Sequence, residues 1–159
     1  RNRYALRISI GLLYNWSMKK PTDYRTGRHC VFGMHVHLVF VTKYRRSGLR
    51  REHFRTLREV FSRVCSDFDA VLSECAGARD HVHLLATYPP SVSVSSLVNS
   101  LKGVSSRMLR KEFPALRCHP GRFAFWSPSY FASSCGGVPL SAIRKYIESQ
   151  DPARHSSPA

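Results

Sequence analysis

The spacing of the apolar residues changes along this chain in a fixed order, and this order constrains the fold more than any other feature. Across residues 30–44 the side chains alternate between two faces, and β-branched and aromatic residues are frequent. One face carries Met34, Val36, Leu38 and Phe40. A period of two is typical of a β-strand, because successive side chains of a strand point to opposite sides. The pattern therefore predicts one long strand at residues 30–44.

Two later stretches have helical spacing instead. Within residues 50–69 the apolar residues recur every three or four positions, at Phe54, Leu57, Val60, Phe61, Val64 and Phe68. Within residues 91–113 they recur at the same spacing, at Val94, Leu97, Val98, Leu101, Val104, Met108 and Leu109. Such spacing gathers the apolar side chains on one stripe of an α-helix. We therefore expect two amphipathic helices, the second with serines as caps at its start and Pro114 at its end.

Shorter elements complete the order. Residues 70–75 and 81–87 read as two strands joined through residues 77–80. Residues 123–131 are rich in aromatic side chains, which favours a fourth strand. A break at Gly136 and Gly137 then precedes a short last helix, whose start and apolar stripe are marked by Pro139, Leu140, Ile143 and Ile147.

The order strand, helix, strand, strand, helix, strand is that of an α+β, ferredoxin-like (RRM-like) fold. We expect an antiparallel four-stranded sheet with two helices on one face and an open second face, plus a C-terminal helix that carries Tyr146. Residues 24–150 are expected to form this single domain, and residues 151–159 a mobile polar tail. Residues 1–23 are expected to be an N-terminal extension, in which Met18 is the natural start of the chain.

The charge of the chain points to a polyanionic partner. Its 25 Lys and Arg against 10 Asp and Glu give a net charge of +15 with His neutral. Nucleic acid is the first candidate and an anionic membrane surface the second. The longest apolar stretches, such as residues 38–41, are far shorter than the roughly 18–20 residues of a membrane-spanning helix. The 5 cysteines include no Cys-x-x-Cys pair, so a disulfide framework is disfavoured and a cytoplasmic location is expected.

Two histidines in one expected strand suggest a metal site. His81 and His83 are two residues apart, so both point to the open face of the sheet while Val82 and Leu84 point to the helices. Two adjacent imidazoles can bind one cation, although a His-x-His pattern alone more often reflects two ordinary surface histidines. The same pattern recurs at His35 and His37, so a zinc site of four histidines is an alternative.

The last helix offers further groups for chemistry. Tyr146 and Gln150 are four residues apart and therefore lie on one face of the helix. A phenol is a weak nucleophile with a pKa of about 10, but a divalent cation on the attacked phosphate would make that phosphate more electrophilic. The side-chain carbonyl of Gln150 could complete the shell of such a cation. Most tyrosines at such positions only pack, so this role is a hypothesis.

Basic residues interleaved with an aromatic ring favour nucleic-acid binding. Lys43, Tyr44, Arg45 and Arg46 follow the first expected strand, a composition suited to gripping phosphates and stacking an unpaired base. The second helix could extend this surface with Lys102, Arg107, Arg110 and Lys111. No Gly-x-x-x-x-Gly-Lys-Ser/Thr loop and no Gly-x-Ser-x-Gly elbow occurs, so neither a nucleotide cofactor nor acyl transfer is expected.

Five stretches together resemble a known family. They are VFVTKYRR at residues 39–46, DHVHLL at 80–85, LVNSLKGVSSR at 97–107, FWSPSY at 125–130 and KYIESQ at 145–150. In order and content they resemble the single-tyrosine HUH transposases of small bacterial insertion sequences, the TnpA-like and REP-associated tyrosine transposases. The resemblance extends from about residue 24 to residue 150.

This resemblance implies a specific reaction. Enzymes of this kind recognise hairpins at the ends of an element in single-stranded DNA and cut one strand by transesterification through a 5′-phosphotyrosine. It implies that Tyr146 is the nucleophile, that His81, His83 and Gln150 hold Mg²⁺ or Mn²⁺, and that the chain forms a homodimer. It also implies association with the bacterial nucleoid. The alternative is a non-catalytic module that binds single strands on the open sheet face, or an inactive domesticated transposase.

Overall fold

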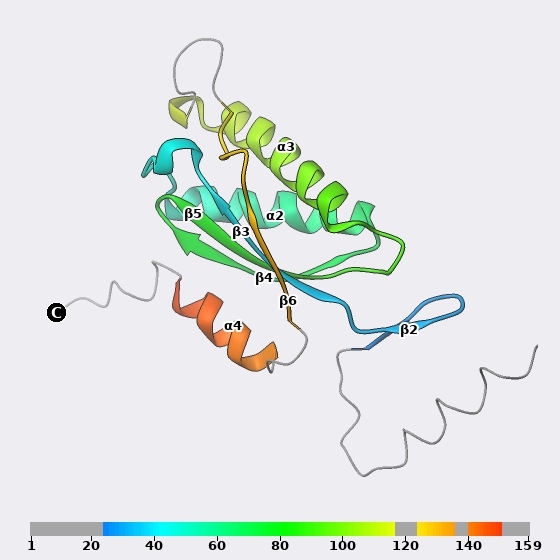
Figure 1. The fold of residues 1–159 in the computed structure, drawn as a ribbon. Coiled ribbons are helices and arrows are strands. Elements are labelled where there is room, and N and C mark those ends of the chain that lie inside the picture. Colours follow the sequence, from blue (N-terminus) through cyan, green and yellow to red (C-terminus); the bar gives the residue numbers. More distant parts are fainter. Residues whose placement is uncertain (1–23, 117–123, 136–139, 151–159) are drawn as a thin grey trace, which may run out of the picture.

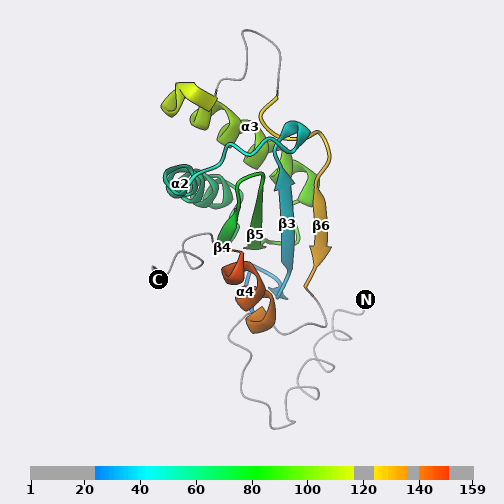
Figure 2. The same ribbon diagram turned by 90° about the vertical axis from the view of Figure 1, so that its left-hand side faces the viewer.

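The structure, a computed structural model, describes residues 24–116, 124–135 and 140–150. Its main sheet is antiparallel, with four strands in the order β4-β5-β3-β6 (Figure 1). In chain order these strands are β3 (His35–Val41), β4 (Val71–Ala78), β5 (His81–Thr87) and β6 (Phe131–Ser134). The helices are α2 (Arg51–Asp67), α3 (Val94–Glu112) and α4 (Leu140–Ser149). Helices α2 and α3 cover one face of the sheet and α4 lies on the other, as Figure 2 shows, so the expected ferredoxin-like order is confirmed.

The core forms where the two predicted periodicities meet. In β3, Val36, Leu38 and Phe40 are buried while the residues between them are only partly covered, which is the expected period of two. They pack with the apolar stripes of α2 and α3, where residues such as Leu57 and Leu101 are fully buried. Burial of each such side chain contributes about 1.5–3 kcal/mol relative to exposure.

Capping groups explain where the two long helices begin. The Ser93 hydroxyl accepts a hydrogen bond from the Ser96 backbone N–H at the start of α3, as the serine-rich start predicts. At the start of α2, the backbone N–H of Arg50 donates to Nδ1 of His53 at 2.9 Å. This imidazole is almost fully buried and stands where a Glu or Gln usually caps.

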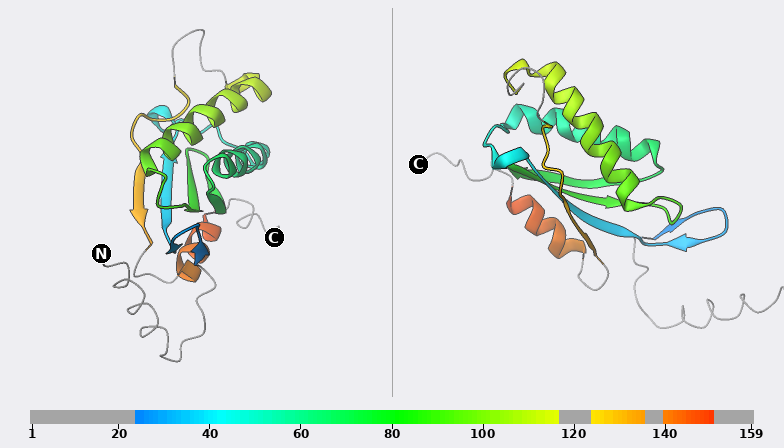
Figure 3. Two further views of the ribbon diagram at one scale, coloured as in Figure 1. Left: turned by 90° about the vertical axis from the view of Figure 1, so that its right-hand side faces the viewer. Right: turned by 45° about the horizontal axis from the view of Figure 1, so that its top comes forward.

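The first expected strand is shorter than predicted at both ends. Residues 31–32 form β2 (Val31–Phe32), which pairs with β1 (Arg25–Thr26), and this small hairpin extends away from the main sheet (Figure 3). At the other end, β3 stops at Val41 and the chain enters the 3-10 turn η1 (Lys43–Arg45). Tyr44 and Arg45 have φ values of 61° and 50°, which no strand accommodates, so the basic residues lie on a turn.

The prediction of a fourth strand at residues 123–131 is wrong. In the described part of this segment, the backbone of Trp126 forms one isolated β-bridge with Thr42. The side chain of Trp126 is buried in the core. Its ring lies 5.9 Å from that of Phe40, and its Nε1 donates to the buried hydroxyl of Ser105 at 2.9 Å. Trp126 fills the core with Phe125 partly buried against it, and the true edge strand β6 begins only at Phe131. Between α3 and this segment, η2 (Pro114–Leu116) forms a single 3-10 turn.

The β4–β5 hairpin is tighter than expected. Strand β4 continues to Ala78, and Arg79 and Asp80 alone form the turn that residues 77–80 were predicted to form. Gly77 pairs with Val82, and a Cβ atom at Gly77 would collide with the backbone of His81. Only glycine therefore permits this close approach, which fixes the start of β5.

The second face of the sheet is not open along its whole length. Helix α4 places Ile147 against Leu85, Ala76 and Cys135, and Ile147 and Leu85 are fully buried. None of the four cysteines in the described ranges forms a disulfide. No helix in these ranges is both long and apolar enough to cross a membrane. The predicted extension at residues 1–23, the break at residues 136–137 and the tail at residues 151–159 lie outside the described residues.

Candidate metal and DNA-processing site

The two histidines of β5 lie side by side on the face that α4 partly covers. His81 pairs with Val41 of β3, and His83 pairs with Val39, so the register places both on the same side. Their ring centroids are 5.0 Å apart with an angle of 82° between the planes. The structure therefore brings together the two imidazoles that the sequence singled out.

Asp80 holds His81 from the hairpin turn. The two side chains hydrogen-bond through Asp80 Oδ1 and His81 Nδ1 at 2.7 Å, and Asp80 Oδ2 accepts from Arg45 Nε at 3.2 Å. Burial alone would raise the pKa of Asp80, but the hydrogen bonds and charges of His81 and Arg45 outweigh it and lower that pKa. Asp80 is therefore a carboxylate at neutral pH, and Nδ1 of His81 is the donor in this bond.

His37 contacts His83 on the same face of the sheet. Nε2 of His37 and Nδ1 of His83 are 3.0 Å apart, within hydrogen-bond distance. Burial lowers the pKa of both residues, and for His83 the additional charges of His81 and His37 lower it to about 4. His83 is therefore a neutral imidazole at physiological pH, which is the form that binds a metal ion.

Tyr146 lies beside these histidines. Its ring centroid is 5.6 Å from that of His83 and 6.3 Å from that of His37, both in edge-on arrangements. Half of the side chain, 51%, remains exposed to solvent. Ile147 packs α4 against the sheet, and α4 therefore places Tyr146 next to the histidine pair of the same chain.

The predicted metal ligand Gln150 makes its side-chain hydrogen bond away from this pair. It is the residue after α4, and its Nε2 donates to the hydroxyl of Ser149 at 3.5 Å. No hydrogen bond connects it to His81 or His83 among the described residues. Its predicted role stays a prediction, for which its four-residue spacing from Tyr146 is the present support.

The alternative of a four-histidine zinc site is wrong. His35 pairs with Thr87 and lies within hydrogen-bond distance, 2.9 Å, of its hydroxyl, whereas His81 pairs with Val41 at the other end of β3. The six residue steps from His35 to Val41 span about 20 Å of extended strand. Within the described ranges no group of three or more His, Cys, Asp and Glu side chains is arranged to hold a metal.

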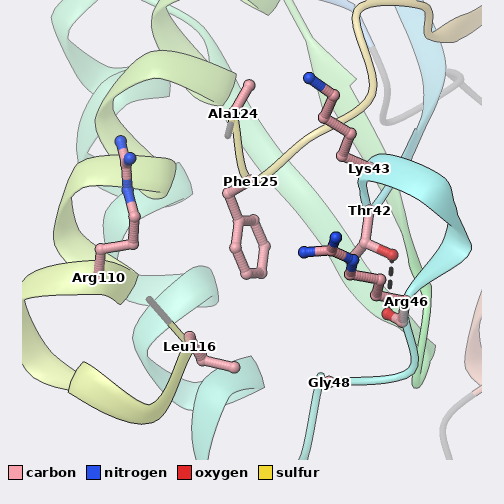
Figure 4. Close-up of a pocket in the computed structure, with 8 residues that line it drawn as sticks. All are labelled: Thr42, Lys43, Arg46, Gly48, Arg110, Leu116, Ala124 and Phe125. Carbon is pink, nitrogen blue, oxygen red and sulfur yellow. Dashed lines mark hydrogen bonds between the residues drawn. The ribbon is translucent and has the colours of Figure 1, made fainter. Parts of the chain in front are cut away.

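Part of the predicted basic surface lies together at the end of β3 that pairs with His81. A pocket there is lined by Thr42, Lys43, Arg46, Gly48, Arg110, Leu116, Ala124 and Phe125 (Figure 4). Lys43 and Arg46 come from the turn after β3 and Arg110 from α3, with the ring of Phe125 between them (Figure 4). Tyr44 is 65% exposed, with the Lys43 ammonium 5.2 Å and the Arg46 guanidinium 5.3 Å from its ring centroid. Cations and exposed or pocket-lining rings therefore occur together, as the sequence predicts.

Two further basic residues of α3 that were predicted to extend this surface differ in their surroundings. The Lys102 ammonium donates to the backbone carbonyls of Ser127, Pro128 and Ser129 at 2.6, 2.9 and 3.4 Å. It therefore fastens the segment before β6 to α3, and burial lowers its pKa. Arg107 is exposed and does not line the pocket.

Sequence reasoning missed the contacts that Asp80 and His37 make with the histidine pair. The signal for Asp80 was its place directly before His81 at the end of a hairpin turn. The signal for His37 was the antiparallel register, in which His37 is diagonal to His83, but that register cannot be read from the sequence because α2 and β4 separate β3 from β5 in the chain. A histidine pair, a phenol and a basic pocket form a set suited to metal-assisted phosphoryl chemistry on a nucleic acid.

Comparison with known proteins finds similar sequences among transposases. A family model described as "Transposase IS200 like" matches residues 30–150. The transposase of insertion sequence IS200 from Salmonella typhimurium is 31% identical over 128 residues, which are 80% of this chain and 84% of that protein. The ISDra2 transposase TnpA of Deinococcus radiodurans is 29% identical over 130 residues, 82% of this chain and 93% of that protein.

Two solved structures are similar in fold. A crystal structure described as that of a candidate transposase from D. radiodurans R1 has a TM-score of 0.65 and 29% identity, covering 80% of this chain and 98% of that one. A REP-associated tyrosine transposase bound to a REP hairpin has a TM-score of 0.55 and 17% identity, covering 83% and 74%. At that identity the second likeness concerns the fold alone.

Proposed function

Because this chain belongs to the family of IS200-like transposases, we propose that it cuts and rejoins single-stranded DNA with Tyr146 as the nucleophile. The observation that carries the proposal is the position of Tyr146, whose ring lies 5.6 Å from that of His83. A phenol placed beside two imidazoles on a basic protein has the groups that attack on a DNA phosphate requires.

In the proposed reaction the Tyr146 oxygen forms a bond to a phosphorus atom of the DNA backbone. The bond from that phosphorus to the 3′-oxygen of the preceding nucleotide breaks, which leaves a 5′-phosphotyrosine and a free 3′-hydroxyl. The phenol loses a proton and the leaving oxygen gains one. One phosphodiester replaces another, so no nucleotide cofactor is consumed, and attack by a 3′-hydroxyl in the reverse direction rejoins the strand.

His81 and His83 are proposed to hold Mg²⁺ or Mn²⁺, with Gln150 as a third ligand. The donor set fits such a cation: neither Nε2 of the two histidines has a hydrogen-bond partner among the described residues, while both Nδ1 atoms do. Imidazole suits Mn²⁺ better than Mg²⁺, which prefers oxygen ligands. When bound, the cation would polarise the scissile phosphate and stabilise charge on the leaving oxygen.

The basic pocket is proposed to bind the hairpin that marks an element end. Lys43, Arg46 and Arg110 supply positive charge for phosphates, and Phe125 and Tyr44 supply rings for unpaired bases. The structurally similar protein bound to a REP hairpin supports this substrate class. A homodimer, in which two chains process the two ends, is part of the proposal and rests on the family resemblance.

A covalent capture experiment tests the reaction. Labelled single-stranded DNA from both flanks of the coding sequence is incubated with Mg²⁺ or Mn²⁺ and resolved on a denaturing protein gel. We expect a covalent band with the wild type and with Tyr130→Phe, a matched control on another exposed tyrosine. Tyr146→Phe and chelated samples should give no band.

Hairpin binding by Tyr146→Phe should stay close to wild type, because only a hydroxyl is removed. Tight binding by the wild type without a covalent band under any metal would instead support the non-catalytic module or an inactive copy. A covalent band that persists in Tyr146→Phe would refute this tyrosine as the nucleophile.

A further inference from the structure

His37 lies next to the proposed metal site without belonging to the proposed ligand set. It faces the same side of the sheet as His83. The reason is that Val39 pairs with His83 and lies two residues from His37 on the same face of β3. Its Nε2 atom is 3.0 Å from Nδ1 of His83. The two rings are nearly parallel, with an angle of 16° between their planes and centroids 5.2 Å apart.

The proton in this contact decides which nitrogen of His83 can bind a cation. A neutral imidazole carries one N–H and one lone pair, on different nitrogens. If Nδ1 of His83 donates to Nε2 of His37, the lone pair of His83 lies on Nε2. If His37 is the donor instead, Nε2 of His83 carries the hydrogen and cannot bind a metal. The side chain at position 37 must therefore act as an acceptor for His83 to serve as a ligand through Nε2.

We propose that His37 is a positioning residue, whose Nε2 accepts the Nδ1–H of His83 and holds that imidazole in the tautomer and orientation in which Nε2 binds the divalent cation. The inference rests on the proposed metal site. It has a parallel at the other ligand, since the Asp80 carboxylate accepts from Nδ1 of His81 at 2.7 Å. Metal-binding histidines in proteins almost always have such an outer partner.

The neighbouring His35 provides a matched control. It is on the same strand and the same face, two residues away, and its Nδ1 atom lies 2.9 Å from the Thr87 hydroxyl. It has no contact with His81 or His83 in the described chain. If removing any imidazole from β3 weakens the fold, a His35 variant should show the same effect as a His37 variant. If the effect is specific to the metal site, the His35 variant should not show it.

The test measures Mn²⁺ binding to the full chain in the absence of DNA, by electron paramagnetic resonance of the free ion. We expect His37→Leu to weaken Mn²⁺ binding by about 10- to 100-fold, the usual effect of losing an outer partner of a metal ligand. His37→Gln should stay within a few-fold of wild type, because its amide oxygen can accept the same hydrogen bond. His35→Leu should bind as the wild type does. Equal binding by wild type and His37→Leu would overturn the proposal, as would equal weakening in both His37 variants.

A second measurement needs no substitution, so it also covers the case in which His37→Leu does not fold. Nitrogen-15 NMR of the imidazoles in the metal-free wild type should show His83 with its hydrogen on Nδ1, and a hydrogen on Nε2 would overturn the proposal. Both readouts are independent of DNA cleavage. If Mn²⁺ binding depends on His37 but no covalent DNA band forms, the proposed reaction alone is refuted. If the wild type binds no Mn²⁺, the positioning role is refuted.

Discussion

Asp80 joins the basic turn to the histidine site, because one carboxylate oxygen bonds His81 Nδ1 at 2.7 Å while the other accepts from Arg45 at 3.2 Å. The same residue also receives two hydrogen bonds on its backbone oxygen, from the N–H and the hydroxyl of Thr42. Asp80 thus links the turn predicted to bind DNA to His81, a predicted metal ligand. Asp80 is the residue through which a change in one can reach the other.

The first prediction concerns the charge of Asp80. Asp80→Asn keeps the shape but removes the carboxylate that orients His81 and strengthens it as a donor to a cation. We expect Mn²⁺ affinity to fall by about 10- to 100-fold, as is usual for such an outer partner. Isothermal titration of Mn²⁺ into the metal-free chain measures this, and an unchanged affinity would contradict the role of Asp80.

Arg45→Ala is the control for that experiment. The Arg45 side chain is 76% exposed, and an exposed ion pair contributes only about 0–1 kcal/mol. The bond from Asp80 Oδ1 to His81 remains in this variant. We therefore expect little change in Mn²⁺ affinity and a weaker, less salt-dependent binding of hairpin DNA, because one cation is lost.

The fold could be predicted wherever periodicity and burial agree. Helix α3 follows its stripe of Leu97, Leu101 and Leu109, all fully buried. The fourth strand could not be placed in this way, because β6 has the sequence Phe-Ala-Ser-Ser and every residue of it is exposed. An exposed edge strand of small polar residues has no apolar alternation, whereas Trp126 has strand-like character but belongs to the core.

The second prediction concerns the attachment of α4. Ile147→Ala removes the fully buried side chain that packs on Leu85 and Ala76. The free energy of detaching α4 should fall by about 2–5 kcal/mol. Amides of α4 should then exchange with deuterium roughly 30-fold faster or more, since each 1.4 kcal/mol is a factor of ten.

Amides of α3 should keep their exchange rates in that variant, because they belong to the separate core of α2, α3 and the sheet. Covalent DNA attachment should fall while hairpin binding persists, since Tyr146 is then less often beside His83. The exposed Arg144→Ala should leave α4 exchange unchanged. Global loss of protection across α3 in Ile147→Ala would show that α4 is not an independent layer.

The histidine site was predictable in part. His81 and His83 could be placed on one face from their spacing alone, and the structure agrees. The choice between His35 and His37 as their neighbour could not be made, because it depends on the pairing of Val39 with His83. Strands β3 and β5 are joined through α2 and β4, so no turn length sets their register. Spacing fixes which face a residue occupies, and only the register fixes what lies across from it.

The third prediction concerns pH. Burial lowers the pKa of His53 from its ordinary value of 6.5 and outweighs the opposing charge of Glu52. At pH values between 6.5 and the lowered pKa, His53 therefore binds a proton in the unfolded chain but not in the folded chain. The stabilisation is complete above pH 6.5 and is lost as the pH falls below it. His53→Asn can still accept the Arg50 N–H but does not titrate.

Urea unfolding with a chelator at several pH values between about 5 and 7.5 checks this. The wild type should lose more stability than His53→Asn on going to the acidic end. His29→Asn, a change at an exposed histidine, should behave as the wild type does. Parallel pH profiles for wild type and His53→Asn would show that His53 does not carry the effect.

The last prediction concerns the buried hydroxyl that anchors Trp126. Ser105 Oγ accepts the indole N–H at 2.9 Å and itself donates to the Leu101 carbonyl at 2.6 Å, and Ser105 is fully buried. Ser105→Ala leaves the indole N–H without its acceptor in the core, which should lower the free energy of unfolding by about 1–3 kcal/mol. In a Trp126→Phe background the same substitution should cost distinctly less, because no N–H remains to be satisfied. Denaturant unfolding of the four proteins of this cycle gives the coupling energy directly, and purely additive effects would mean that the hydrogen bond does not hold Trp126 in the core.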